Sequence, residues 1–285
     1  ACSPREPLVS HASPTDDLAA ATDAWHAERV AALTAPDGWL SLVTLAWLEP
    51  GANRVGRDPA AAVTHAGLPA DHVGTLHVDG DGGIRFEPAS GVLVTGVLDD
   101  GMLRTDADGP PTVVQVGRCR FEVIVRGGRP AVRMRDPEAD SRVRFAGIER
   151  FPVDPAWSIE AAFEPAAGGE AVAVDSVIGV VDQTAVAGRA RFEQGGRAVD
   201  LVLHPGGAED RYFLVFGDAT NGRETSGGGR FLLVERSGPG TVRLDFNRAY
   251  NPPCSFTDFA TCPLPVPGNR LPFAVTAGER RYLRP

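Results

Sequence analysis

The sequence of 285 residues contains no lysine, so all 28 of its basic residues are arginine. This absence excludes a P-loop NTPase, a protein kinase, an enzyme that forms a Schiff base through lysine, and any mechanism with a lysine general base. Arginine in place of lysine is typical of a GC-rich genome, which is the simplest explanation. The exclusion holds whatever the origin.

Long apolar runs and basic stripes are also missing. No segment approaches the roughly 20 apolar residues of a membrane-spanning helix. The 37 acidic residues outnumber the arginines and give a net charge of −9, so nucleic acid is not an expected partner. With 43% hydrophobic residues, 33 glycines and 24 prolines, the composition predicts a globular protein of one large or two ordinary domains.

The common metal-binding and nucleophile motifs do not occur. The chain has four cysteines and six scattered histidines, without C-x-x-C, H-E-x-x-H or G-x-S-x-G patterns. We therefore predict neither a metal site nor a cofactor. Cys119 shares one face of the alternating stretch 118–126 with apolar residues, which predicts a core thiol and not a nucleophile.

The remaining pattern predicts an all-β protein of two packed β-sandwich or barrel units with a short N-terminal α-helix. Ser13-Pro14 is typical of a helix start, and apolar residues then recur at helical spacing as far as Pro36. Beyond this point, short β-type segments alternate with turns rich in Gly, Asp and Pro. We divide the chain into a tether or signal remnant (1–15), a helix and apolar segment (16–50), a first β unit (51–143) and a second β unit (144–285).

The first residues are typical of a bacterial lipoprotein just after its signal peptide. If Ala1 is one retained residue of the signal peptide, Cys2 stands where the lipid is attached, and the residues up to Asp17 are rich in Pro, Ser and charge, as in a tether. We therefore expect an extracytoplasmic protein that meets the membrane only through a lipid on Cys2. The alternative is a cytoplasmic protein.

Residues 245–269, which we call the proline loop, combine two cysteines with several prolines. Proline fixes φ and removes a backbone donor, so an ordered irregular loop is expected. Cys254 and Cys262 lie eight positions apart, which suits a disulfide ring in an oxidising compartment; two free buried thiols are the alternative. A disulfide and a lipid anchor support each other because both require export.

A predicted hairpin gathers polar side chains at the start of the proline loop. Residues 230–236 and 241–247 pair around a four-residue loop at 237–240, which places Arg230 opposite Asn247. We expect the second β unit to bind a small polar or anionic molecule here. Arginines would bind the anion, asparagine amides would orient the ligand, and a tyrosine would stack on it or donate a hydrogen bond to it. The ligand-binding residues are Arg230, Asn247, Arg248, Tyr250 and Asn251.

Two alternative functions use the same residues. Glu224, on the glycine-rich connection before the hairpin, and Asp245 would form an acid–base pair, so the first alternative is a cofactor-free hydrolase with these two catalytic carboxylates. The second is a structural or protein-interaction module, in which an Arg230–Asp245 ion pair only orients the proline loop.

Four motifs of the second half carry a resemblance to a known family. They are DATNG (218–222), GGGRFL (227–232), DFNRAYNPPC (245–254) and ATCPLP (260–265). Together with shorter motifs elsewhere in the chain, these four motifs resemble the bacterial and archaeal family named domain of unknown function 1684 (DUF1684), over residues 25–279. The family name implies no activity.

The first β unit is similar, more distantly, to a forkhead-associated sandwich through residues 51–58 and 117–121. That resemblance implies phosphothreonine binding by an arginine, whose place Arg57 takes. The Ser-Arg pair expected before His77 is replaced by Thr-Leu, so the sequence departs from the pattern that binds the phosphopeptide.

Overall fold

Two β-sheets form the first unit in the computed structural model, which describes residues 14–97 and 99–284. One sheet has the strand order β1-β9-β8-β7-β6 and the other has the order β3-β2-β4-β5. The strands are β1 (Leu42–Trp47), β2 (Gly51–Gly56), β3 (Val63–Thr64), β4 (Gly74–Val78), β5 (Ile84–Pro88), β6 (Val94–Thr95), β7 (Val114–Val116), β8 (Cys119–Arg126) and β9 (Arg129–Arg135).

Strand β8 shows why this sequence forms a sandwich. Cys119, Phe121 and Val123 are buried at alternate positions, as strand geometry requires, and they share a core with residues of both sheets. The ring of Phe121 meets Phe86 of β5 edge to face, with centroids 5.4 Å apart. The thiol of Cys119 is fully buried in this core, which confirms its predicted core position.

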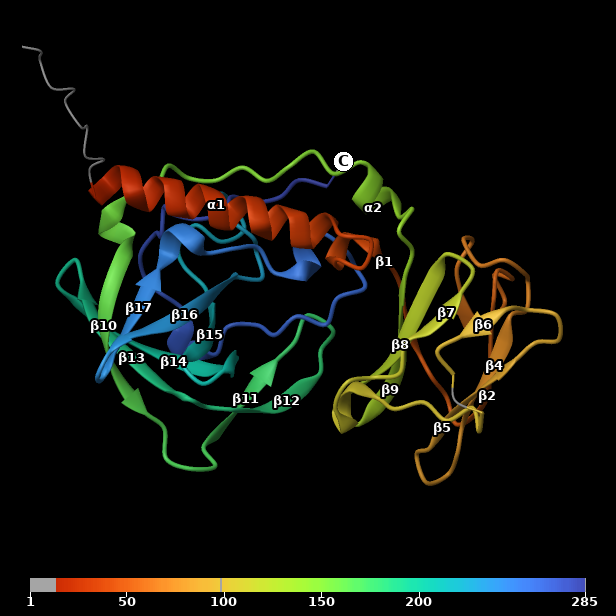
Figure 1. Cartoon of the computed structure of the whole chain (residues 1–285). Coiled ribbons are helices and arrows are strands. Elements are labelled where there is room, and N and C mark those ends of the chain that lie inside the picture. The colour runs from red at the N-terminus through yellow and green to blue at the C-terminus, as the bar shows by residue number, and fades with distance from the viewer. Residues whose placement is uncertain (1–13, 98, 285) are drawn as a thin grey trace, which may run out of the picture.

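The second unit is a closed barrel with the strand order β10-β13-β14-β15-β16-β17. The barrel closes where β17 pairs with β10, and its interior is filled by buried apolar side chains. The hairpin β11–β12 leaves the barrel between β10 and β13 and lies beside the first unit (Figure 1). The strands are β10 (Ser158–Pro165), β11 (Ala171–Asp175), β12 (Val181–Ala185), β13 (Gly188–Gln194), β14 (Arg197–Ala208), β15 (Arg211–Phe216), β16 (Arg230–Gly238) and β17 (Thr241–Asp245).

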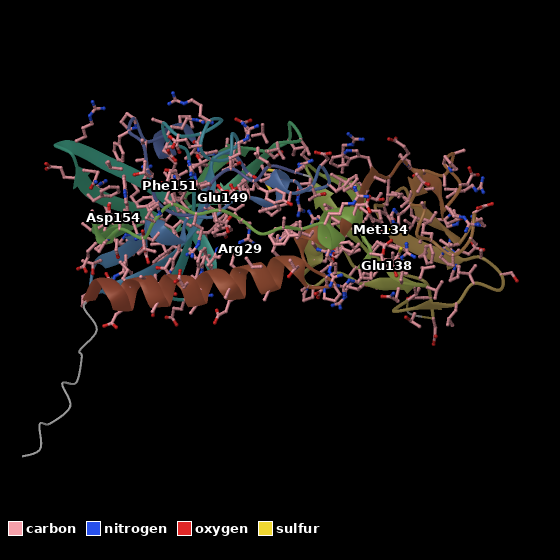
Figure 2. The ribbon with its side chains drawn as sticks, turned by 90° about the horizontal axis from the view of Figure 1, so that it is seen from above. Arg29, Met134, Glu138, Glu149, Phe151 and Asp154 are labelled. Carbon is pink, nitrogen blue, oxygen red and sulfur yellow. The ribbon has the colours of Figure 1, made fainter. Side chains whose placement is uncertain are left out.

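Helix α1 (Pro14–Thr34) lies along the barrel, although the strand that follows it belongs to the first unit (Figure 1). In Figure 2, Arg29 lies on the barrel side of α1. A short helix, α2 (Asp140–Val143), follows β9, and an extended segment then runs across the second unit through Glu149 and Asp154 (Figure 2). No helix in the described part of the chain is long and apolar enough to cross a membrane.

The predicted fold class is confirmed: the protein is mostly β, with one N-terminal helix and a six-stranded barrel. The short β-type segments expected beyond Pro36 are present as strands, among them β4, β5 and β15. The apolar run 39–48 forms a 3-10 turn followed by β1. Beyond β17, the proline loop is irregular, with short 3-10 turns, as its prolines predict.

The predicted hairpin register is wrong by one residue. Glu235 pairs with Arg243, and the ladder is irregular just before Gly238, where β16 carries an extra residue. The connecting turn is therefore Pro239-Gly240, in which Gly240 has a φ of 73°. Strand β17 ends at Asp245, so Asn247 lies in a 3-10 turn and not opposite Arg230.

Candidate functional site

Arg230, at the start of β16, is tied to Asp218 inside the protein. Both side chains are fully buried, and Nη2 of Arg230 donates to Oδ2 of Asp218 at 2.8 Å. The guanidinium also donates to the backbone oxygens of Val275, at 2.8 Å, and Ala277. Arg230 thus fixes the C-terminal segment to the barrel. The ion pair that we considered for it, with Asp245, is replaced by the pair with Asp218.

Asp245, Asn247 and Arg248 meet beside α1. The backbone N–H and Nδ2 of Asn247 donate to Oδ1 of Asp245 at 3.2 and 3.0 Å, and Nε of Arg248 lies 3.4 Å from Oδ2. The Asn247 amide also exchanges two hydrogen bonds with the backbone of Asp154. Asp245 and Arg248 line a hollow of about 910 Å³ between α1 and the barrel. The polar atoms of this cluster bond mainly to each other and brace the turn.

Tyr250 and Asn251 pack beneath α1. The guanidinium carbon of Arg29 lies 4.8 Å from the centre of the Tyr250 ring, and Nη2 of Arg29 donates to the backbone oxygen of Asn251 at 3.1 Å. The N–H of Asn251 donates at 2.7 Å to Glu279, and complete burial raises the pKa of Glu279. Burial also raises the pKa of Tyr250 to about 12. These residues dock α1 onto the barrel.

Glu224 and Asp245 have different partners. The carboxylate of Glu224 is half exposed and lies 3.8 Å from Nη2 of Arg280. Asp245 is mostly buried and is held by Asn247 and Arg248. The hollow that Asp245 lines does not include Glu224. The structure therefore places the two carboxylates in separate ion pairs.

Cys254 and Cys262 are neighbouring free thiols in the structure. The backbone N–H of Cys254 donates to Sγ of Cys262 at 3.2 Å. A hydrogen bond from the thiol of Cys262 lowers the pKa of Cys254 and raises that of Cys262. The loop closure expected from the sequence is present as a contact between thiols, without the covalent bond.

Two further predicted residues lie away from the proline loop. Arg57 is half exposed, and its Nε lies 3.1 Å from Oδ1 of Asp71. Cys2, the expected lipidation site, lies outside the described residues.

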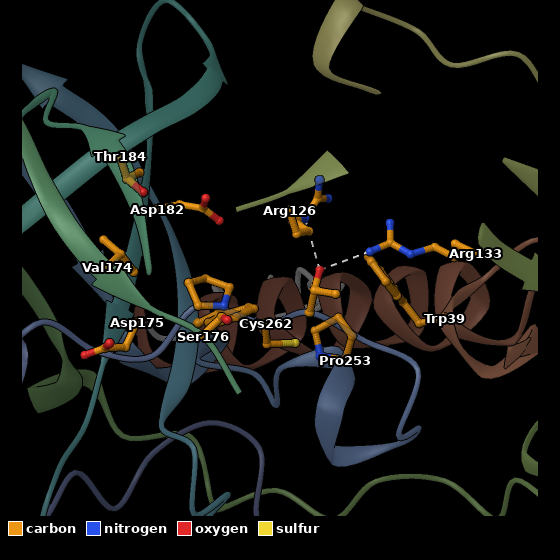
Figure 3. Close-up of a pocket in the computed structure, with 13 residues that line it drawn as sticks. Trp39, Arg126, Arg133, Val174, Asp175, Ser176, Asp182, Thr184, Pro253 and Cys262 are labelled. Carbon is orange, nitrogen blue, oxygen red and sulfur yellow. Dashed lines mark hydrogen bonds between the residues drawn. The ribbon is translucent and has the colours of Figure 1, made fainter. Parts of the chain in front are cut away.

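A pocket that the sequence did not indicate lies between the two units (Figure 3). Arg126 of β8 and Arg133 of β9 enter it from the first unit, and Thr261 and Cys262 of the proline loop line it from the second. Both arginines reach one hydroxyl: Nε of Arg126 and Nη2 of Arg133 lie 3.3 and 3.1 Å from Oγ1 of Thr261. The cavity of about 320 Å³ is large enough for a small molecule.

The arginine end of this pocket carries more positive than negative charge. Arg133 is only 7% exposed, yet Glu122 lies 3.8 Å from it and is held more closely, at 2.9 Å, by Arg135. Arg126 pairs with Asp106 at 2.8 Å, so three arginines share two carboxylates. Burial, followed by the charge of Arg126, lowers the pKa of Arg133 to about 10. Its Nε atom is buried and has no partner among the described residues.

The opposite wall of the pocket is polar and acidic. It is formed by the β11–β12 region, which Figure 3 shows facing the arginines. One of its carboxylates, Asp182, also accepts a hydrogen bond of 3.3 Å from the backbone N–H of Gly127, which ties the two units together. The polar residues of this wall are Asp175, Ser176, Asp182 and Thr184. The pocket therefore has a basic end and an acidic end.

The sequence carries one signal for this pocket, a charged residue within an apolar strand. Arg133 lies in β9 within the run 131–134, all of whose side chains are buried. A buried charge requires partners, so an arginine in an apolar strand indicates a special site. Its partner Thr261 lies 128 positions away, and no local pattern indicates that contact.

A protein family and a solved structure are similar to this chain. The family described as "Protein of unknown function (DUF1684)" matches residues 143–280. An uncharacterized protein from gene locus rrnAC0354 of Haloarcula marismortui, solved by NMR, is 31% identical over 49% of this chain and 78% of that chain, with a TM-score of 0.41. No curated protein matches the sequence. On this basis, the chain belongs to the DUF1684 family.

Proposed function

We propose that the protein binds a small anionic molecule in the pocket between its two units. The observation that carries this proposal is the convergence of Arg126 and Arg133 on the Thr261 hydroxyl in the lining of a cavity of about 320 Å³. This keeps the ligand class expected from the sequence but moves the site, because Arg230 is fully buried and its Nη atoms are bonded to Asp218 and to two backbone oxygens.

The unbalanced charge of the arginine end favours the binding of an anion. Two guanidinium groups that meet at one neutral hydroxyl repel each other, and burial increases that repulsion because the dielectric constant is low. An anion between them would supply the missing negative charge and accept charge-assisted hydrogen bonds, which are the strong ones in proteins. The unpartnered Nε of Arg133 offers a donor for this purpose.

The acidic wall constrains the other end of the ligand. Asp175 and Asp182 accept hydrogen bonds and favour a donor group, such as an amine or a hydroxyl. The ligand that fits both ends is small, with an anionic head toward the arginines and a donor group toward the β11–β12 region. Such a molecule would also bridge the two units.

Isothermal titration calorimetry at constant ionic strength tests the proposal with two probes. Inorganic phosphate tests the anionic end, and O-phosphoethanolamine, which adds an ammonium group, tests both ends. We expect both probes to bind, the second more tightly. Arg133→Met should weaken phosphate binding by about 10-fold or more, since a charge-assisted hydrogen bond contributes about 1.5–3 kcal/mol.

The matched control is Arg129→Met, on the same hairpin. Arg129 is 60% exposed and pairs with Glu49 outside the pocket, so its loss should leave the affinity unchanged. Equal affinity of wild type and Arg133→Met for phosphate would contradict the anion site. Equal binding of the two probes to wild type would contradict only the role of the acidic wall.

The disulfide and the lipid anchor expected from the sequence remain proposals. The contact between Cys254 and Cys262 supports oxidation to a disulfide in an oxidising compartment. Alkylation and mass spectrometry without reductant test it: recovery of both cysteines in alkylated form would contradict it. For the anchor, the complete gene product should fractionate with membranes, and Cys2→Ala should release it; soluble recovery of the unaltered product would contradict it.

The cofactor-free hydrolase also remains a proposal, but the separate ion pairs of Glu224 and Asp245 give it less support than the pocket gives to binding.

A further inference from the structure

The first unit brings together three side chains that are far apart in the sequence. His65 follows β3, Cys119 begins β8 and Asp136 follows β9. Nε2 of His65 lies 2.8 Å from Oδ2 of Asp136, and the ligand atoms of all three residues lie within 4.8 Å of one another. In a tetrahedral zinc site with bonds of about 2.0–2.3 Å, neighbouring ligand atoms are roughly 3.3–3.8 Å apart. Small side-chain adjustments would bring these three atoms to that spacing.

The space above the cluster is kept open by a glycine. A Cβ atom on Gly67 would lie 2.3 Å from Oδ2 of Asp136 and 2.7 Å from Nε2 of His65. A hollow of about 430 Å³ opens over the cluster and is lined by His65, Gly67 and Asp136. Cys119 is fully buried beneath it. Two ligands therefore face the hollow and one closes the site from the core, which leaves a coordination position open.

The charges around the cluster suit a divalent cation. Arg118 donates through Nε to Oδ1 of Asp136 at 2.9 Å, and its Nη1 lies 3.0 Å from Glu138. Metal binding displaces the proton of the Cys119 thiol. With Cys119 as a thiolate, three negative charges face one arginine, so the group has a charge of −2 (−3 + 1). An ion of charge +2 neutralises it. Arg118 can stay on Oδ1, because carboxylate ligands commonly accept a further hydrogen bond.

We propose that His65, Cys119 and Asp136 form a binding site for one zinc-class metal ion, with a fourth coordination position open to the hollow. Imidazole, thiolate and carboxylate are the ligand types that zinc takes, and three protein ligands with one open position are typical of sites that exchange or activate a bound molecule. This site is separate from the anion pocket. The sequence did not indicate it because its ligands do not occur at motif spacing.

Metal titration tests the site directly. Zn²⁺ added to the metal-free protein in competition with a chromogenic chelator should bind with one tight equivalent per chain. Co²⁺ should bind at the same place and give the near-ultraviolet charge-transfer band of a cobalt–thiolate bond. His65→Ala should weaken Zn²⁺ binding by more than about 10-fold, since loss of a partner outside the ligand shell alone has an effect of that size.

Matched variants distinguish this site from other thiols and histidines. Cys119→Ser should abolish the cobalt–thiolate band, whereas the double variant Cys254→Ser/Cys262→Ser should keep both band and stoichiometry. His77→Ala is the histidine control, because His77 also lies beside a carboxylate, Glu87, at 3.2 Å. It should bind Zn²⁺ like wild type.

One variant tests the geometry without removing a ligand. Gly67→Ala fills the space above the cluster and should also abolish tight binding, which keeps the test decisive if Cys119→Ser does not fold. The proposal is overturned if wild type binds Zn²⁺ no more tightly than His65→Ala does. It is also overturned if the cobalt band disappears only in the Cys254→Ser/Cys262→Ser variant.

Discussion

The buried pair of Arg230 and Asp218 gives the sharpest prediction about stability. Both side chains are fully buried, and Arg230 also supplies hydrogen bonds to two backbone oxygens. Arg230→Met would leave the Asp218 carboxylate without its counter-charge and both oxygens without their donor. Breaking a buried pair costs about 3–5 kcal/mol, so we expect the free energy of unfolding to fall by about 4 kcal/mol. Asp218→Asn should cost roughly 3 kcal/mol.

A double-mutant cycle measures the coupling. If the two residues interact directly, the double variant Arg230→Met/Asp218→Asn should be more stable than additivity predicts, by about 2–3 kcal/mol. The control cycle pairs Arg230→Met with Asp245→Asn, whose partners are Asn247 and Arg248. Its effects should add within about 0.5 kcal/mol.

Urea denaturation, followed by tryptophan fluorescence and by circular dichroism, gives the four free energies of each cycle. The reasoning is refuted if Arg230→Met lowers stability by less than about 1 kcal/mol, the size expected of an exposed pair. It is equally refuted if the coupling is found with Asp245 and not with Asp218.

Three further predictions follow from single residues. Burial favours the neutral form of Asp136, but hydrogen bonds from a neighbouring arginine and histidine lower its pKa from 3.8 to about 2. The ionised Asp136 should contribute roughly 2 kcal/mol to the free energy of unfolding above pH 3.8, and this contribution should be lost as the pH falls through about 2. Asp136→Asn should remove this pH dependence from urea unfolding. Gly229→Ala should lower the free energy of unfolding by about 1–3 kcal/mol or more, because Gly229 has a φ of 89° and a Cβ would lie 2.5 Å from the backbone oxygen of Phe216. Gly227→Ala is the control: the atom nearest to its Cβ would lie at 3.7 Å, so the melting temperature should change little. Arg29→Met should speed hydrogen exchange in α1, since the guanidinium joins the helix to the loop beneath it; unchanged exchange would contradict that role.

The fold class could be predicted because local patterns determine it. Alternation of apolar residues in β8 and turn residues between short segments indicate two β units without any long-range information. The hairpin register could not be predicted, because the irregularity before Gly238 changes the loop from four residues to two. A shift of one residue exchanges the two faces of a strand, so the predicted side-chain cluster around Arg230 was lost with the register.

The candidate site was less predictable for a related reason. The sequence indicated arginines for an anion, but the arginines of the pocket come from the first unit and meet Thr261 of the second. Arg230 has the same residue type and a motif context, yet it is used to hold the C-terminal segment. The residue type suggested the proposed chemistry, whereas tertiary contacts determine which arginines line the pocket.

The most direct test of the anion pocket is a crystal structure after a soak in sodium selenate, whose selenium atom scatters anomalously. We predict an anomalous peak within hydrogen-bonding distance of the guanidinium groups of Arg126 and Arg133 and of the Thr261 hydroxyl. The same soak of Arg133→Met should show no peak there. Peaks only at exposed arginines of the wild type, with none in the pocket, would contradict the account.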